Sequence, residues 1–346
     1  MLGLHGGREP LSRRPNITGE QRYRETWFRR ARTLVANVVI ETVAATGRLH
    51  PAASPSRHGV EVVRDVAYGP DPKWHRLDIY RPTRPPGPLP VVLYIHGGAF
   101  HLLSKDTHWL MGLAFARFGY LVLNISYRLA PRHPYPAAIE DTCRAWRWLA
   151  ANAGELGADP ARAIVAGESA GGNLASALAV ATSQRRSEPW ARETFDCGLV
   201  PRAVMPFCAM LQASHAERFG QRRKLPWWAD GVIRDAGASY LRGHPREPGP
   251  TTELADPLLL FEAACARGAQ RFDRPLPPFF AAVGTRDPLL DDTRRLDVAL
   301  RALGVPCEAR YYRGGIHAFH ALVWDPAARR CWRDAFAFLD RHVRRA

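Results

Sequence analysis

The chain of 346 residues is 46% hydrophobic and 10% aromatic, which excludes a disordered protein and supplies enough apolar surface for a large core. Its net charge of +15 is compatible with binding to nucleic acid or to an anionic membrane. The arginines, however, are spread along the chain in short runs and do not form a dedicated binding segment. We therefore expect a solvated basic surface and no nucleic-acid partner.

The N-terminus lacks the pattern of a secretory signal, and no stretch approaches about 18 uninterrupted apolar residues. We expect a cytoplasmic protein without stable membrane insertion. The cysteines show no spacing typical of a zinc site, so we predict free thiols, although the sequence leaves a disulfide pair open. No metal and no cofactor are predicted. The six cysteines are Cys143, Cys197, Cys208, Cys265, Cys307 and Cys331.

Residues 1–57 are predicted to form an N-terminal segment with one amphipathic helix over 20–46 and a Pro- and Ser-rich linker after it. The helix precedes every strand, and its apolar stripe would leave a large exposed patch if it stood alone. We therefore expect the stripe to pack on another part of the chain. It consists of Trp27, Phe28, Ala31, Leu34, Val35, Val38, Val39 and Val43.

From residue 58 to residue 346, strand and helix patterns alternate, which is typical of a mostly parallel sheet flanked by helices. The first two strands are separated by a Gly-Pro-Asp-Pro turn and are expected to be antiparallel. The predicted strands are 60–68, 77–80, 91–96, 121–126, 163–166, 202–211, 279–283 and 307–312, and the predicted helices are 109–118, 137–153, 173–180, 291–303 and 326–343.

Residues 212–250 interrupt this alternation, because they are polar, basic and rich in Gly and Pro, yet carry several aromatic side chains. We predict that they form an insertion that packs with the helix over 20–46 as a lid above the carboxyl ends of the strands. Trp27, Phe28, Trp227 and Trp228 would then be candidates to line a pocket beneath the lid. The alternative is that Trp227 and Trp228 fill the core of the lid itself.

The segment Gly167-Glu168-Ser169-Ala170-Gly171-Gly172 joins a short apolar strand to a helical stretch. Gly-x-Ser-x-Gly between a strand and a helix is typical of a nucleophile elbow, a tight turn that holds its serine above the sheet edge. Ser169 would stand at the N-terminus of the helix, where the helix dipole favours developing negative charge.

A serine nucleophile needs a base and an acid that orients the base. Asp287 and His317 both directly follow predicted parallel strands, so both are expected at the edge of the sheet where the serine stands. We predict Asp287 as the acid and His317 as the base. Asp287 could instead be a turn residue, Asp291 or Asp292 could be helix caps, and His320 competes with His317.

The segment His96-Gly97-Gly98-Ala99-Phe100 follows the strand over 91–96. Its position and composition favour a loop that presents backbone N–H groups to an oxyanion. The alternative is an ordinary Gly-Gly turn with a surface histidine.

Together, these motifs resemble those of the hormone-sensitive-lipase-like esterases of the α/β-hydrolase fold, in the order of that family. The resemblance covers about residues 58–346. It departs from the family at Ala99, where a third loop glycine is usual, at Ser126 and Arg132, where acidic residues are usual, and at Glu168, where Asp is commoner. The segments that carry the resemblance are 96–100, Tyr127 to Ala137, 167–172, Asp287 to Leu289 and His317 to Phe319.

The resemblance implies an α/β fold with a mostly parallel eight-stranded sheet, flanking helices and a helical cap. It implies a serine carboxylic-ester hydrolase that forms a covalent acyl-enzyme on small to medium acyl esters, with a small-molecule ester substrate and a possible homodimer. An amidase or arylformamidase with the same triad is the alternative, and a non-catalytic binding protein is disfavoured because all triad residues are present. The implied site consists of Ser169, Asp287 and His317 as the triad, the N–H groups of Gly98, Ala99 and Ala170 as the oxyanion hole, and Phe100, Trp227 and Trp228 as pocket residues.

Overall fold

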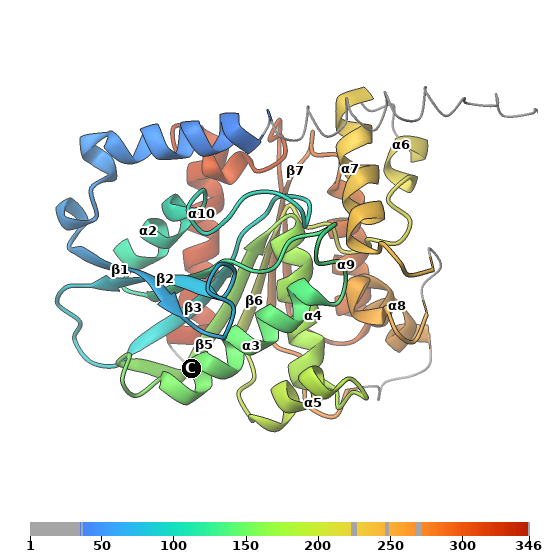
Figure 1. Ribbon diagram of the computed structural model, residues 1–346, viewed down its shortest axis with the longest axis horizontal. Coiled ribbons are helices and arrows are strands. Elements are labelled where there is room, and N and C mark those ends of the chain that lie inside the picture. The colour runs from blue at the N-terminus through green and yellow to red at the C-terminus, as the bar shows by residue number, and fades with distance from the viewer. Residues whose placement is uncertain (1–34, 36, 223–226, 246–248, 267–271, 345–346) are drawn as a thin grey trace, which may run out of the picture.

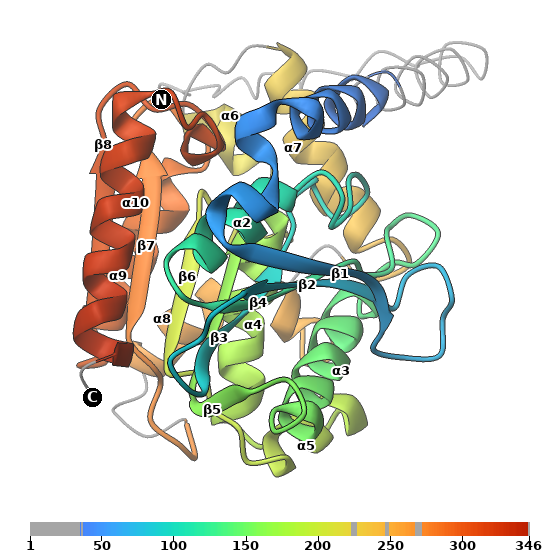
Figure 2. The ribbon, with the colours of Figure 1, turned by 90° about the vertical axis from the view of Figure 1, so that its left-hand side faces the viewer.

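The computed structural model describes residues 35, 37–222, 227–245, 249–266 and 272–344, with the backbone alone for 222 and 227–230. Its centre is an eight-stranded sheet in the order β1-β2-β4-β3-β5-β6-β7-β8, with helices on both faces (Figures 1 and 2). β2 pairs antiparallel with β1 and with β4, and all other neighbours are parallel. The strands are β1 (Val60–Ala67), β2 (Arg76–Pro82), β3 (Leu89–Ile95), β4 (Leu121–Ile125), β5 (Ala158–Glu168), β6 (Ala203–Phe207), β7 (Phe279–Gly284) and β8 (Cys307–Tyr312).

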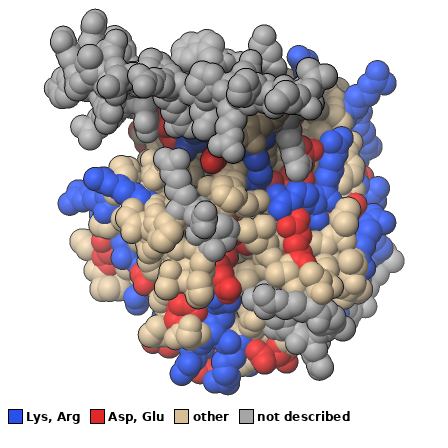
Figure 3. Space-filling view, turned by 90° about the vertical axis from the view of Figure 1, so that its right-hand side faces the viewer, with Lys and Arg blue, Asp and Glu red and all other residues tan. Residues whose placement is uncertain are grey.

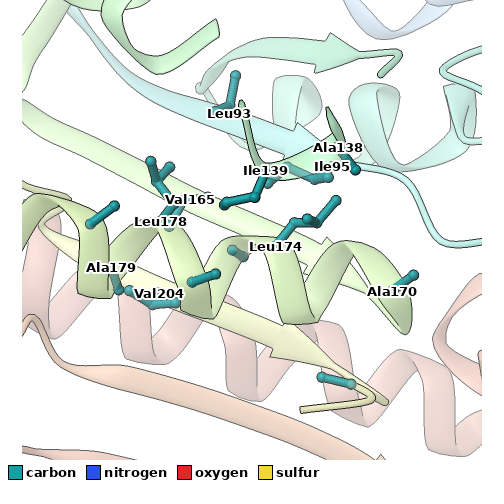
Figure 4. Packing of buried hydrophobic residues seen from close by; sticks show 14 of the residues in the cluster. Leu93, Ile95, Ala138, Ile139, Val165, Ala170, Leu174, Leu178, Ala179 and Val204 are labelled. Carbon is teal, nitrogen blue, oxygen red and sulfur yellow. The ribbon is translucent and has the colours of Figure 1, made fainter. Parts of the chain in front are cut away.

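The helices divide between the two faces of the sheet and bury a hydrophobic cluster on each. Side chains of β3 alternate between the clusters, as the two-residue period of a strand requires. Leu93 packs toward α3 and α4 (Figure 4). Tyr94 belongs to the other cluster, with side chains of α2 and α10. From α2 onward, the α-helices in the described part of the chain are α2 (Trp109–Arg117), α3 (Ala137–Asn152), α4 (Ala170–Ser183), α5 (Pro189–Asp196), α6 (Arg218–Arg222), α7 (Trp227–Tyr240), α8 (Pro257–Ala266), α9 (Leu290–Ala302) and α10 (Pro326–Leu339).

The predicted sheet is confirmed strand by strand, and the insertion adds no strand within its described residues but contains α6 and α7. Outside the insertion, two α-helices in the described part of the chain were not predicted. α8 buries Leu258, Leu260 and Phe261 and is apolar nearly all round, so it lacks the one-sided pattern that identifies a surface helix. α5 is only 8 residues long, too short for a clear helical period.

A helix over residues 37–49 lies against the loop after β3 and against α2 (Figure 1). The side-chain oxygen of Asn37 accepts a hydrogen bond from the Leu103 N–H at 3.1 Å, and the Trp109 indole donates to the Ala44 carbonyl at 3.0 Å. The inner face of this helix therefore carries polar groups that pair with the rest of the chain.

The predicted packing of the apolar stripe is wrong for the described part of this helix. Because the polar face is turned inward, the valines face outward. Trp27, Phe28, Ala31 and Leu34 lie outside the described residues. The exposed side chains are Val35 (61%), Val38 (52%), Val39 (54%) and Val43 (65%).

All six cysteines are free thiols, and three of them, Cys143, Cys208 and Cys331, are buried. Figure 3 shows one face of the molecule, on which basic side chains are spread out with acidic ones between them. None of the helices in the described part of the chain has the length and apolar character needed to cross a bilayer.

Candidate active site

The turn between β5 and α4 holds Ser169 at a positive φ, with φ 53° and ψ −113°. Such a conformation is costly for a residue with a side chain and persists only where the surroundings impose it. Here the Ser169 N–H donates to the Phe207 carbonyl at 2.8 Å, and a Cβ on Gly167 would lie 2.3 Å from the Gly171 carbonyl oxygen. Strand and helix thus approach as closely as the elbow pattern predicts.

The loops after β7 and β8 bring Asp287 and His317 into direct contact. Nδ1 of His317 lies 2.9 Å from Oδ2 and 3.2 Å from Oδ1 of Asp287. Asp287 is 1% exposed, and its Oδ1 also accepts the Leu289 N–H at 2.8 Å. With Nδ1 occupied by the carboxylate, Nε2 is the nitrogen of His317 that is free to accept a proton.

The electrostatic surroundings of His317 favour its charged form. Burial lowers the pKa of the imidazole, but the charge of Asp287 and the hydrogen bond to it raise it more, and the charge of Glu168 adds to the increase. The pKa of His317 is raised to about 9 as a result. An imidazolium that forms during a reaction would therefore be stabilised here.

Ser169 stands at the same carboxyl edge of the sheet as these two side chains, since β5, β6, β7 and β8 are parallel neighbours. Within the described residues, no hydrogen bond joins the Ser169 hydroxyl to His317. Such bonds are often long in the absence of substrate and shorten in the reacting complex.

The loop after β3 has the backbone of a tight, left-handed turn, with φ 114° at Gly98, 54° at Ala99 and 62° at Phe100. The N–H groups of His101 and Leu102 fold back onto the Gly98 carbonyl. Among the described residues, the N–H groups of Gly98 and Ala99 have no hydrogen-bond acceptor. The N–H of Ala170, at the start of α4, has no partner within its helix, so these donors are available to an anion.

The predicted pocket residues have different outcomes. Phe100 is fully buried and stacks on Tyr240 of α7, with ring centroids 3.9 Å apart and planes at 2°. It thus joins the loop to the insertion and contributes no exposed surface to a pocket. The side chains of Trp227 and Trp228 lie outside the described part of the structure, so their role stays a prediction.

A cavity of about 760 Å³ lies beside the loop that follows β3. The helix over 37–49 and α7 both contribute to its wall, so these two segments meet around one space, although Ser169 is not among its lining residues. The lining includes Asn37, Glu41, His101, Leu103, Asp235 and Ser239.

The contacts of His320 and Asp292 bear on two of the predicted alternatives. His320 is fully buried and its Nε2 lies 3.2 Å from Oε2 of Glu168, whereas His317 is the histidine that contacts Asp287. Asp292 is not a helix cap: it is fully buried, and both of its carboxylate oxygens lie 2.6 Å from the Arg218 guanidinium.

We expect Asp292→Asn to lower the free energy of unfolding by about 3–5 kcal/mol, because it removes one partner of a buried ion pair. Urea denaturation measures this value. The neighbouring Asp291→Asn is the matched control, since the Asp291 side chain is 33% exposed and should cost less than about 0.5 kcal/mol. Equal losses in the two variants would contradict the importance of the Asp292–Arg218 pair.

No local pattern indicated that two further groups, Cys208 and the Glu168 carboxylate, would be buried at this edge. Cys208, after β6, is buried, and its sulfur lies within 4.8 Å of the ligating atoms of Asp287 and His317. Burial, followed by the negative charges of Asp287 and Glu168, raises the pKa of the Cys208 thiol well above its usual range. The thiol therefore stays protonated. The second group is the buried carboxylate of Glu168, which lies between two histidines.

A family model described as alpha/beta hydrolase fold matches residues 92–321. Carboxylesterase NlhH of Mycobacterium tuberculosis is 34% identical over 243 residues, which cover 69% of this chain and 70% of that protein. Versiconal hemiacetal acetate esterase of Dothistroma septosporum is 28% identical over 293 residues, which cover 81% and 80% of the two chains. The crystal structure of esterase LipW from Mycobacterium marinum is similar to this chain with a TM-score of 0.65 and 27% identity, over 94% of this chain and 91% of that one.

Proposed function

The chain belongs to the α/β-hydrolase fold family, in its hormone-sensitive-lipase-like esterase branch, and from that premise we propose that this carboxylic-ester hydrolase uses Ser169, His317 and Asp287 as its triad. One observation carries the proposal. Asp287 binds Nδ1 of His317 at the carboxyl edge of the sheet, where the strained elbow holds Ser169 at the start of α4.

In the proposed reaction, the hydroxyl oxygen of Ser169 attacks the ester carbonyl while Nε2 of His317 takes the hydroxyl proton. Asp287 stabilises the imidazolium, which then gives the proton to the leaving alcohol as the C–O bond breaks. Water attacks the acyl-enzyme by the same route, releases the acid and restores Ser169. The N–H groups of Gly98, Ala99 and Ala170 are the proposed donors to the carbonyl oxygen as it becomes negative.

We propose that the acyl group is small to medium in length. The helix over 37–49 and α7 share the wall of one cavity, and Phe100 fixes α7 to the loop that carries the proposed oxyanion donors. A cap held in this way limits the space for a long acyl chain. The name of the relative from Dothistroma septosporum, versiconal hemiacetal acetate esterase, includes an acetate, which is an acyl group of this size.

A panel of p-nitrophenyl esters from acetyl to palmitoyl tests the substrate range. We expect kcat/KM to peak between butanoyl and octanoyl and to fall for longer chains, because the cap limits the length of the pocket. A value that rises steadily to palmitoyl would contradict the small-to-medium range. The same preparation is assayed with N-formylkynurenine, and faster turnover of this formamide than of the best ester would favour the amidase or arylformamidase alternative.

We also propose a cytoplasmic location, which is supported by six free thiols in one chain, since such thiols persist in reducing compartments. The homodimer remains a prediction that size-exclusion chromatography with light scattering would test.

A further inference from the structure

The residue before the proposed nucleophile carries a buried carboxylate that the proposed reaction does not use. Glu168 is the last residue of β5 and is 7% exposed. Burying a carboxylate is unfavourable unless charged or hydrogen-bonding groups compensate for the lost water. The groups that surround Glu168 therefore indicate which parts of the site its negative charge stabilises.

On one side, Glu168 lies against the start of the loop that carries Gly98 and Ala99. Its Oε1 is 3.8 Å from Nε2 of His108, and that same nitrogen accepts the Gly97 N–H at 3.3 Å. A Cβ on Gly97 would lie only 2.9 Å from Oε1 of Glu168. The carboxylate therefore sets how closely this loop can approach the elbow.

On the other side, Glu168 contacts the segment that carries the proposed base. Its Oε2 lies 3.2 Å from Nε2 of His320, three residues after His317. The His320 ring is stacked on Phe207 at 4.8 Å, and the Trp332 indole donates to the His320 carbonyl at 3.0 Å. Neither ring nitrogen has a well-aligned hydrogen bond within the described residues, so the carboxylate is the nearest compensating group.

We propose that Glu168 is a positioning residue, whose carboxylate holds the loop of the oxyanion donors and the segment of the base in one arrangement around Ser169. This inference rests on the proposed function, since it takes Ser169 and His317 as the reacting groups.

The charges around Glu168 support an anionic carboxylate. Burial raises its pKa, but the neighbouring side chains of His108 and His320 outweigh burial and hold it well below the usual value. The negative charge in turn contributes to the raised pKa of His317. Several titratable groups from neighbouring elements face Glu168. They are Tyr94 in β3, His96 just after β3, His108, Tyr127, Cys208 just after β6, and His317 and His320 after β8.

Glu168→Gln keeps the shape of the side chain and removes its charge. We expect kcat for p-nitrophenyl butyrate to fall by about 10- to 100-fold with KM nearly unchanged, the size of effect that a small misplacement of reacting groups produces. Because the charge raises the pKa of His317, its loss lowers that pKa. His317 then becomes neutral at a lower pH, so the acidic limb of kcat/KM against pH moves to lower pH.

His320→Phe is the second variant, since it keeps a ring on Phe207 and removes the group that contacts Glu168. It should lower kcat by a similar factor. The double variant should lose little more than either single one, because both changes remove the same contact. This variant also tests the proposal if Glu168→Gln fails to fold.

Asp141→Asn is the matched control. Asp141 is a fully buried carboxylate that also contacts a histidine, since its Oδ1 lies 2.9 Å from Nε2 of His75, and it pairs with the Arg128 guanidinium as well. We expect it to lower the thermal midpoint while leaving kcat and the pH profile unchanged. A purely structural role of Glu168 would give the two variants the same behaviour, and that result would overturn the proposal.

The rate of fluorophosphonate labelling separates this inference from the proposed function. Absence of label on Ser169 in the wild type would contradict the proposed triad. If Ser169 is labelled but Glu168→Gln reacts at the wild-type rate with the wild-type pH dependence, the triad stands and the positioning role of Glu168 is wrong.

Discussion

Ser169→Ala is expected to lower kcat for ester hydrolysis by about 10⁶-fold, the size of loss measured when a serine hydrolase loses its nucleophile. Without the hydroxyl, no acyl-enzyme can form, and His317 has no proton to accept from this position. The fold should remain, because the elbow depends on the Ser169 backbone and its neighbouring glycines rather than on the side chain. Initial rates with p-nitrophenyl butyrate give the value, and circular dichroism gives the state of the fold.

Fluorophosphonate labelling followed by peptide mass analysis is the control for this result. We expect the label on Ser169 in the wild-type protein and none on the Ala variant. A label on another peptide, or an Ala variant within tenfold of wild type, would show that a different group is the nucleophile.

Asp287→Asn is expected to lower kcat by about 10⁴-fold, the size of loss measured for the same change in a serine protease. The carboxylate accepts the Nδ1 proton of His317 at 2.9 Å and so keeps Nε2 free to act as the base. An amide in its place can donate to Nδ1, which moves the ring proton to Nε2 and blocks proton transfer from Ser169. The loss should fall on kcat, with little change in KM.

Asp291→Asn is the control for this change as well, because Asp291 lies in the same segment and pairs with Arg294. It should retain nearly full activity. Comparable losses in the two variants would mean that the loss arises from disturbing α9 rather than from His317. His317→Ala should cost several orders of magnitude and His320→Ala far less, and the reverse order would identify His320 as the base.

The fold and the paired side chains of the candidate site could be predicted because each left a local signal. β3 is a continuous apolar run, and Asp287 and His317 each follow a parallel strand, so the sheet itself brings them to one edge. The contact between His317 and Asp287 confirms that expectation, while their catalytic roles stay proposals.

Other features left no local signal. Periodicity shows that the N-terminal helix has an apolar stripe, but not which way the stripe faces, and hydrogen bonds to Asn37 and Ala44 decide its orientation. The contacts of Glu168 with His108 and His320 join positions far apart in the sequence. No pattern within a single segment could indicate them.

The positive φ angles at the carboxyl edge of the sheet also have an energetic consequence for the whole molecule. Each left-handed non-glycine residue raises the free energy of the native state by on the order of 1–3 kcal/mol. Several such residues together approach the net stability of an ordinary domain, which is about 5–15 kcal/mol. The two hydrophobic clusters must offset this cost, so the packing of the helices on both faces of the sheet is what allows the site to keep its geometry. The residues concerned are Ala99, Phe100, Leu103, Ser169, Cys208 and Ala318.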